Sequence, residues 1–343
     1  MPVTNAFRAP MPARFVPSRP AVSQGLLGIQ DFPLHHGEAL EHAVIAWRLV
    51  GPPGGPVIAA LGGISADRTV CDLDARVCGW WRELAGPGLP LDTDRYAVLG
   101  IDYLGSGASS APTPGQSDFP VIDARDQAAA LVAVCDALGI ERLHAVAGAS
   151  YGGMVGLALA ESAPARVGRV LAISAAHRSN ALATGWRSIQ RAIVRHSLAL
   201  GDRSGGLALA RSLAMTTYRT RAELERRFPV DAPAGTRSPG FAVERYLLAR
   251  GAEYANVARP ESFLCLSESI DRHRVDPARV RVPVSLAAIA EDQLVTLAEV
   301  RELARLLGGP VALHELHSEF GHDAFLKERD LLAPVFKSAL EGE

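Results

Sequence analysis

The sequence predicts an α/β protein with a mostly parallel central sheet and an inserted helical cap. Short apolar runs typical of buried strands alternate with longer segments of helical periodicity along most of the chain. Between residues 178 and 275 this alternation stops, and apolar residues recur at helical spacing instead. We therefore expect a flexible N-terminal arm over 1–25, a core over 26–177 and 276–343, and a helical cap over 178–275.

The expected strands and helices can be placed along the chain from these patterns. Strand-like apolar runs lie at His42–Leu49, Pro56–Leu61, Tyr96–Leu104, Leu143–Gly148, Val167–Ser174, Val282–Ile289 and Val311–Leu316. Core segments of helical pattern lie at Ala124–Leu138, Gly153–Glu161, Thr296–Leu307 and Ala324–Leu332. Asp123 is a favoured N-cap residue for the first of these helices, and Gly139 follows it where a glycine commonly ends a helix.

Composition limits the classes of function. The 343 residues are 48% hydrophobic with a net charge of −2, which is ample for one large core. No apolar run is long enough to span a membrane, and no motif or basic excess points to nucleic acid. The first 20 or so residues lack the apolar stretch of a secretory signal, and the four cysteines lack paired spacing. We expect reduced thiols, no metal site and a cytoplasmic location.

The first half of the cap is strongly basic. From Arg178 to Arg227 there are ten arginines and only three acidic residues. These arginines either form a solvated helix surface or a positive rim that attracts a polyanion such as a phosphorylated acyl carrier. The pattern alone leaves both interpretations open.

The segment Gly148-Ala149-Ser150-Tyr151-Gly152 carries the main chemical signal. It follows an apolar strand-like run and precedes a run of helix formers. A strand, a sharp turn with serine at its apex and a helix form the nucleophile elbow of serine hydrolases. The alternative is an ordinary glycine-rich turn. A dinucleotide-binding loop fits less well, because the G-x-G-x-x-G pattern is absent.

An activated serine needs a base and an orienting acid, which follow it in that fold in the order acid, then histidine. Asp292 ends the apolar run 282–290, with Glu291 as the competing acid. His322 follows a glycine in a loop after the last strand-like run, whereas His317 and His314 are interpreted as structural. The base would deprotonate Ser150, and the acid would hold the imidazole tautomer.

The same geometry predicts the donors that would stabilise an oxyanion. They are the backbone N–H of Tyr151 and that of Leu61 or Gly62, in the glycine-rich turn after an early strand. This chemistry needs no cofactor.

Several motifs resemble the homoserine O-acyltransferase family of the α/β-hydrolase superfamily. They are Trp80-Trp81, Gly86-Pro87-Gly88, Leu91–Tyr96, Asp118–Pro120 with Asp126, the elbow, Thr217–Thr220 and Gly321–Leu326. Two departures are Ala59-Ala60-Leu61-Gly62-Gly63, where the family usually has His-Ala-Leu-Thr-Gly, and Tyr151, where methionine is usual. Both border the expected acyl pocket and leave the acyl donor open.

The resemblance implies an α/β-hydrolase fold and acyl transfer from acetyl-CoA or succinyl-CoA to the hydroxyl of L-homoserine in methionine biosynthesis. It implies a triad of Ser150, Asp292 and His322, an acyl-serine intermediate and a homodimer. It also implies that Arg219 contacts the carboxylate of the amino acid and Asp323 its ammonium. From the residues alone, we would instead favour Asp323 as the N-cap of the next helix and Arg219 as one more arginine of the basic cap. A serine O-acyltransferase of cysteine biosynthesis and a serine esterase are the alternative functions.

Overall fold

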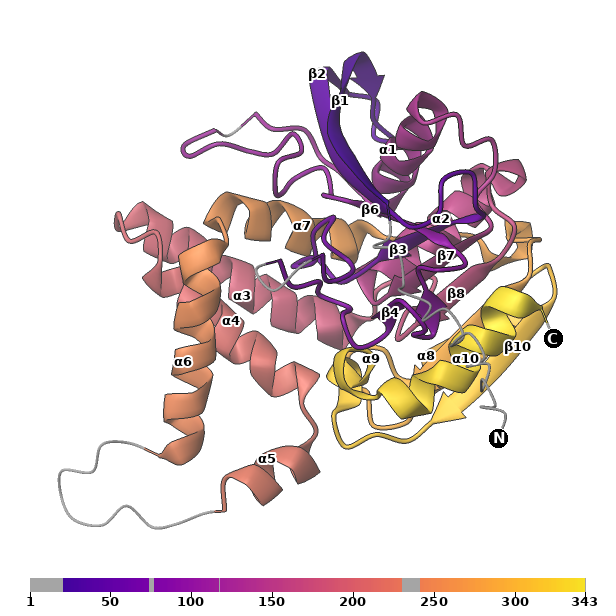
Figure 1. Ribbon diagram of the computed structural model, residues 1–343. Helices are drawn as coiled ribbons and strands as arrows, with labels where there is room; N and C mark the ends of the chain where they lie inside the picture. Colours follow the sequence, from indigo (N-terminus) through magenta and orange to yellow (C-terminus); the bar gives the residue numbers. More distant parts are fainter. Residues whose placement is uncertain (1–20, 74–76, 117, 230–240, 343) are drawn as a thin grey trace, which may run out of the picture.

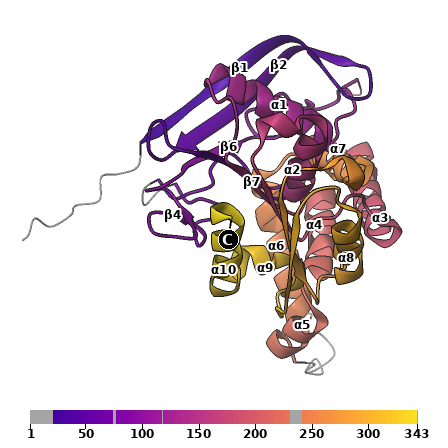
Figure 2. The same ribbon diagram turned by 90° about the vertical axis from the view of Figure 1, so that its right-hand side faces the viewer.

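A sheet of eight strands forms the centre of the molecule (Figures 1 and 2). The computed structural model describes residues 21–73, 77–116, 118–229 and 241–342. In spatial order the strands are β1 (Val22–Pro33), β2 (Ala39–Val50), β6 (Ala97–Ile101), β3 (Val57–Leu61), β7 (Ala145–Ala149), β8 (Val170–Ile173), β9 (Val284–Ile289) and β10 (Val311–Leu316). The pairs from β6 to β10 are parallel, whereas β1–β2 and β2–β6 are antiparallel. The predicted mostly parallel sheet is therefore confirmed.

The strand predictions succeed in the core and fail at the N-terminus. Each of the predicted strand-like runs overlaps one strand of the sheet. The prediction of a flexible arm over 1–25 is wrong for its last residues, because β1 begins at Val22 and pairs with β2. The rest of the arm, residues 1–20, lies outside the described residues. A short two-stranded sheet of β4 (Ala85–Gly86) and β5 (Leu91–Asp92) also had no sequence signal.

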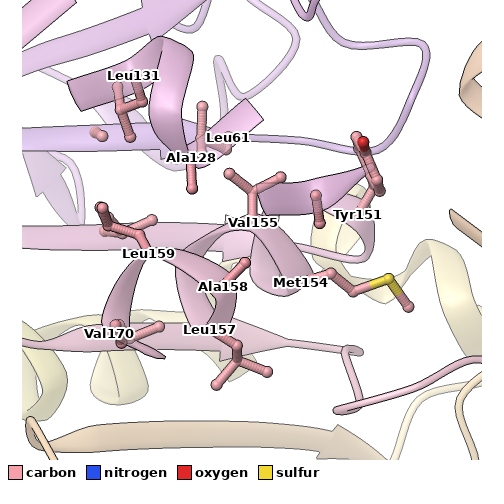
Figure 3. Close-up of a cluster of buried hydrophobic side chains, with 14 of the residues drawn as sticks. Leu61, Ala128, Leu131, Tyr151, Met154, Val155, Leu157, Ala158, Leu159 and Val170 are labelled. Atoms are coloured by element: carbon pink, nitrogen blue, oxygen red, sulfur yellow. The ribbon is translucent and has the colours of Figure 1, made fainter. Parts of the chain in front are cut away.

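Helices bury the sheet on both faces. On β3, Ala59 and Leu61 belong to the cluster beneath α1 (Ala124–Ala137), α2 (Tyr151–Ser162) and α8 (Leu297–Leu306), and Figure 3 shows part of it. Ile58 and Ala60 belong to a second cluster with α10 (Arg329–Glu341). Alternate residues of a strand point to opposite faces, so a sheet covered on both sides requires continuous apolar runs.

Each predicted core helix overlaps a helix of the structure. Asp123 caps α1, since its side chain accepts a hydrogen bond from the Arg125 N–H, and Gly139 has a φ of +69° just beyond that helix. The predicted helix Ala324–Leu332 is instead two helices, α9 (Ala324–Lys327) and α10, because the backbone leaves the helical region at Glu328 (φ −100°, ψ 62°).

In the described residues between β8 and β9, five α-helices lie within the segment predicted as a cap. They are α3 (Ala181–Ala199), α4 (Gly205–Tyr218), α5 (Arg221–Arg227), α6 (Ala242–Val257) and α7 (Pro260–Arg272). Figure 1 shows α3, α4 and α6 together on one side of the sheet. Val194, Leu207, Ala210 and Phe263 form an apolar cluster that joins α3, α4 and α7. No helix in the described part of the chain is long and apolar enough to cross a membrane.

Candidate active site

Ser150 lies at a sharp turn between β7 and α2. Its φ of 53° and ψ of −118° are unusual for a residue with a side chain, as expected for a nucleophile elbow. The flanking glycines are required by close packing. A Cβ atom on Gly152 would lie 2.1 Å from the Leu61 carbonyl oxygen, and one on Gly148 would lie 2.3 Å from Gly152. The sequence therefore places a serine hydroxyl at the carboxyl end of a central strand.

Three side chains from the carboxyl ends of parallel strands form a hydrogen-bonded relay. His322 Nε2 lies 2.9 Å from Ser150 Oγ, and His322 Nδ1 lies 2.7 Å from Asp292 Oδ2. The other oxygen of Asp292 accepts hydrogen bonds from the backbone N–H groups of Leu294 and Val295, at 2.8 and 3.1 Å. His322 and Asp292 are both buried. The carboxylate is thus fixed in orientation by its own turn.

The competing acid, Glu291, has other partners. Its side chain binds Nδ1 of His317 at 2.9 Å and the backbone N–H of Ser318 at 2.9 Å. The structure therefore pairs His322 with Asp292. Burial lowers the pKa of His322, but the charge and hydrogen bond of Asp292 outweigh it, so the net pKa is raised above the ordinary value for histidine.

The predicted oxyanion donors lie next to the relay. Tyr151 is the first residue of α2, so its N–H has no acceptor within the helix. The Gly62 carbonyl accepts hydrogen bonds from the Gly152 N–H at 2.9 Å and from the Tyr103 hydroxyl at 2.7 Å. These two bonds fix the backbone of the turn that follows β3, which carries the predicted Leu61 or Gly62 donor.

The Tyr151 side chain does not line the active-site cavity. It is fully buried, its ring packs edge-on against Tyr103 with centroids 5.0 Å apart, and its hydroxyl contacts Ser269 Oγ (Figure 3 labels Tyr151). Tyrosine in place of methionine therefore alters the packing behind the nucleophile rather than the pocket in front of it. This corrects the expectation that the substitution borders the acyl pocket.

A cavity of about 290 Å³ opens in front of Ser150 and His322. Core residues such as Trp80 form one wall, and cap helices form the other, with Trp186 from α3 and Phe263 from α7. A pocket with mostly apolar walls and a few converging polar groups is the usual form of a small-molecule site. The relay therefore faces a cavity that is lined by both core and cap.

Known proteins share this architecture. A family model described as alpha/beta hydrolase fold matches residues 61–328. A homoserine O-succinyltransferase of Xanthomonas campestris pv. campestris is 40% identical over 96% of this chain and 86% of its own length. A serine O-succinyltransferase of Litchfieldella anticariensis is 35% identical over 75% of this chain and 80% of its own.

The chain belongs to the homoserine O-acyltransferase family of the α/β-hydrolase superfamily. The fold agrees with this membership. The structure of homoserine O-acetyltransferase from Bacillus anthracis superposes with a TM-score of 0.85, at 20% identity, over 93% of this chain and 97% of that one. The chain is therefore an acyltransferase, as the sequence motifs predicted.

Arg219 and Asp323, predicted from this family to bind the amino acid, form an ion pair. Arg219 Nε lies 3.2 Å from Asp323 Oδ2, and Arg219 Nη1 lies 3.2 Å from Glu223 Oε1. Asp323 lines the cavity and Arg219 does not. Burial raises the pKa of Asp323, and Arg219 and His322 oppose that effect. The alternative cap role of Asp323 finds no support, because its side chain makes no capping hydrogen bond to α9.

Sequence reasoning missed Arg211, which lines the cavity from α4. Its guanidinium lies between two aromatic rings, 5.2 Å from the centroid of Tyr218 and 4.8 Å from that of Tyr254. In the described chain it has no carboxylate in ion-pair contact. The signal was the seven-residue spacing of Arg211 and Tyr218, which places both on one helix face, but nine other arginines nearby obscured it.

The basic first half of the cap is largely neutralised in three dimensions. Of its ten arginines, nine lie within ion-pair distance of a carboxylate: Arg178, Arg187, Arg191, Arg195, Arg203, Arg219, Arg221, Arg226 and Arg227. Several partners come from distant segments, including Glu261, Asp271 and Glu319. This pairing favours the solvated-surface interpretation over a rim that attracts a polyanion.

Proposed function

We propose that this protein transfers an acetyl or succinyl group from acyl-CoA to the side-chain hydroxyl of L-homoserine, in methionine biosynthesis. The observation that carries the proposal is the Ser150–His322–Asp292 relay, which opens onto a cavity whose lining also includes the carboxylate of Asp323 and the guanidinium of Arg211. The names of two sequence relatives, homoserine O-succinyltransferase and homoserine O-acetyltransferase, support acyl transfer to homoserine. Acyl-CoA is a co-substrate, and the chemistry needs no cofactor.

The first half of the reaction acylates the serine. His322 Nε2 takes the proton of Ser150 Oγ as this oxygen attacks the thioester carbonyl carbon. Asp292 stabilises the imidazolium that forms. The oxyanion accepts hydrogen bonds from the N–H of Tyr151 and that of Leu61 or Gly62. The carbon–sulfur bond then breaks, the imidazolium gives its proton to the sulfur, and CoA leaves with Ser150 acylated.

The second half transfers the acyl group to the amino acid. The homoserine hydroxyl gives its proton to His322 Nε2 and attacks the acyl-serine carbonyl, and collapse returns the proton to Ser150 Oγ. We assign the substrate ammonium to Asp323 and the substrate carboxylate to Arg211, whose guanidinium faces the cavity unpaired. Arg219 forms an ion pair with Asp323 and so orients the Asp323 carboxylate toward the cavity. This assignment revises the role expected for Arg219.

Mass spectrometry and thiol release test the proposal together. Incubation with acetyl-CoA or succinyl-CoA alone should yield one acylated serine per chain, and Ser150→Ala should yield none. CoA release beyond this single turnover should require an added acceptor, because transfer competes with hydrolysis only when the cavity excludes water. A fully active Ser150→Ala enzyme contradicts the proposed mechanism.

The same assay separates the alternative functions. Continuous CoA release without an acceptor indicates a hydrolase, and release faster with L-serine than with L-homoserine indicates a serine O-acyltransferase. The serine O-succinyltransferase relative makes this second comparison necessary. Comparing rates with the two acyl-CoA donors identifies the donor.

We further propose a cytoplasmic homodimer. Exposed apolar side chains on the cap support the dimer: Leu200, Leu209, Leu248 and Val257 have exposed fractions of 73%, 52%, 46% and 84%. Exposed apolar groups that recur on neighbouring elements are typical of protein–protein contacts. The biosynthetic role supports the location.

A further inference from the structure

Two histidines in the turn between β1 and β2 face the N-cap residue of α1. His35 Nδ1 lies 2.7 Å from Asp123 Oδ2, and His36 Nε2 lies 3.2 Å from the same oxygen. All three atoms lie within 4.8 Å of one another. None of these residues lines the active-site cavity. Figures 1 and 2 show the β1–β2 hairpin beside α1, so the cluster joins two elements that are distant in sequence.

The carboxylate and the turn are already held in place. Asp123 Oδ1 accepts a hydrogen bond from the Arg125 N–H at 2.8 Å, and the His35 N–H donates to Asp126 Oδ1 at 2.6 Å. Asp123 is buried, whereas the side chains of His35 and His36 are 40% and 35% exposed. A fixed carboxylate beneath two accessible imidazoles leaves an open approach for an ion from solvent.

The donor atoms are those preferred by zinc and similar divalent ions. Tetrahedral zinc, with bonds of about 2.0–2.1 Å, places neighbouring ligand atoms roughly 3.3–3.5 Å apart. The 3.2 Å separation of His36 from Asp123 nearly matches this geometry. The hydrogen bond from His35 would need to open by less than about 1 Å, and the two ring nitrogens, which lie within 4.8 Å of each other, would need to reach the same spacing. Water can fill the fourth position.

The local charge favours a cation. Three carboxylates gather here, those of Asp123, Asp126 and Glu161, against the guanidiniums of Arg125 and Arg279. Arg125 is 2.7 Å from Glu161, and Arg279 is largely exposed at 3.7 Å. Helix capping uses Oδ1 of Asp123, whereas both imidazoles face its other oxygen, Oδ2.

We propose that His35, His36 and Asp123 bind one divalent transition-metal ion of the zinc type and clamp the β1–β2 turn to α1. Each imidazole binds through the nitrogen that now faces Asp123, so this nitrogen gives up its proton on binding and the neutral ring carries its proton on the other nitrogen. For His35 that other nitrogen, Nε2, lies 3.5 Å from the Arg125 guanidinium, and this contact opens when the proton moves there. No local sequence pattern reveals this site, because His35 and Asp123 are 88 residues apart in the chain. The proposal does not depend on the acyltransfer reaction.

Isothermal titration of the metal-free full-length protein with Zn²⁺ tests the site. We expect one tight equivalent per chain and a rise in melting temperature with added Zn²⁺, because an ion that binds only the folded state stabilises it. The double variant His35→Gln/His36→Gln should weaken that equivalent on the order of tenfold or more, since even outer-shell changes cost 10–100-fold. Asp123 is left intact because it caps α1.

His42→Gln is the matched control, because His42 is an exposed histidine on β2 outside the cluster. It should keep the affinity and the thermal shift of the unmodified protein. The proposal is overturned if the unmodified protein binds no stoichiometric Zn²⁺. It is equally overturned if the double variant binds with unchanged affinity, which would assign the ion to other side chains. Neither result bears on the serine chemistry.

Discussion

Ser150 and its partners show how neighbouring residues receive different tasks from the backbone. Asp292 and Glu291 are adjacent carboxylates, yet only Asp292 reaches the imidazole of His322. The turn after β9 decides this, because the N–H groups of Leu294 and Val295 hold Asp292 in place. Sequence pattern identified the acid to within one residue, and the turn conformation, which is tertiary information, made the choice.

Removing the relay carboxylate should change both rate and pH dependence. In Asp292→Asn the imidazole loses the group that raises its pKa, and burial then lowers that pKa. We expect kcat/KM to fall on the order of 10³–10⁴-fold. Because the reaction needs neutral His322, the acidic limb of the pH profile should move to lower pH.

The pH dependence of folding stability gives a second, independent prediction for Asp292→Asn. A raised pKa in the folded state stabilises the protein below the pKa of unfolded histidine, and that contribution is lost as pH rises through the folded pKa. The variant should therefore lose most stability on the acidic side. Glu291→Gln is the control and should leave the activity profile in place, since its carboxylate contacts His317. An equal loss of activity in the two variants contradicts the assignment.

Arg211 should control recognition of the acceptor. Loss of a charged hydrogen bond costs about 1.5–3 kcal/mol, so Arg211→Gln should raise the KM for homoserine roughly 10–100-fold. Formation of the acyl-enzyme from acetyl-CoA should keep its rate, because that step precedes acceptor binding. Arg221→Gln removes a largely exposed cap arginine and serves as the control. An unchanged KM for homoserine in Arg211→Gln would show that another group binds the substrate carboxylate.

At the scale of elements, burial explains which segments the sequence could predict. The central strands are covered on both faces, so their apolar runs are continuous and easily recognised. β1 is a largely exposed edge strand that pairs only with β2, and its pattern carries little apolar signal. The positions of Arg211 and of the Tyr103 hydroxyl depend on packing between distant elements, which no local pattern reports.

The contact between the end of β6 and the turn after β3 offers a test of positioning. Tyr103→Phe removes the hydroxyl that donates a hydrogen bond to the Gly62 carbonyl, in the turn that carries the predicted oxyanion donor. We expect kcat to fall roughly tenfold, less than the 10²–10³-fold effect of removing a donor itself, with little change in KM. Tyr96→Phe is the control, because its hydroxyl makes no such contact with the turn. Equal kcat values for Tyr103→Phe and the unmodified enzyme would show that the turn holds its geometry unaided.

At the scale of the whole molecule, both the core and the cap contribute residues to the site. The relay comes from loops after β7, β9 and β10, whereas α3, α4 and α7 close the cavity above it. In the proposed mechanism these helices would limit the access of water to the acyl-serine, so the cap would determine whether the acyl group reaches an amino acid or is hydrolysed. The placement of the cap therefore matters for the reaction and not only for stability.

The outer helix of the cap is incompletely covered in a single chain. Within α6 only Gly251 is buried, where the helix crosses α4 so closely that a Cβ atom would lie 2.2 Å from the Ala208 carbonyl oxygen. Leu248 on α6 and Leu209 on α4 are left exposed. A second copy that covers these residues would bury apolar surface at about 25 cal/mol per Å².

Light scattering after gel filtration should therefore give twice the mass of one chain, and Leu248→Asp should shift the protein toward the monomer, since a buried unpaired carboxylate opposes association. Leu306→Asp, on α8, makes the same change at a similarly exposed leucine of the core and should leave the dimer intact. A monomeric unmodified protein, or dissociation by both variants alike, would contradict an interface through the cap. Because α4 carries both Leu209 and Arg211, dissociation of Leu248→Asp should also raise the KM for homoserine.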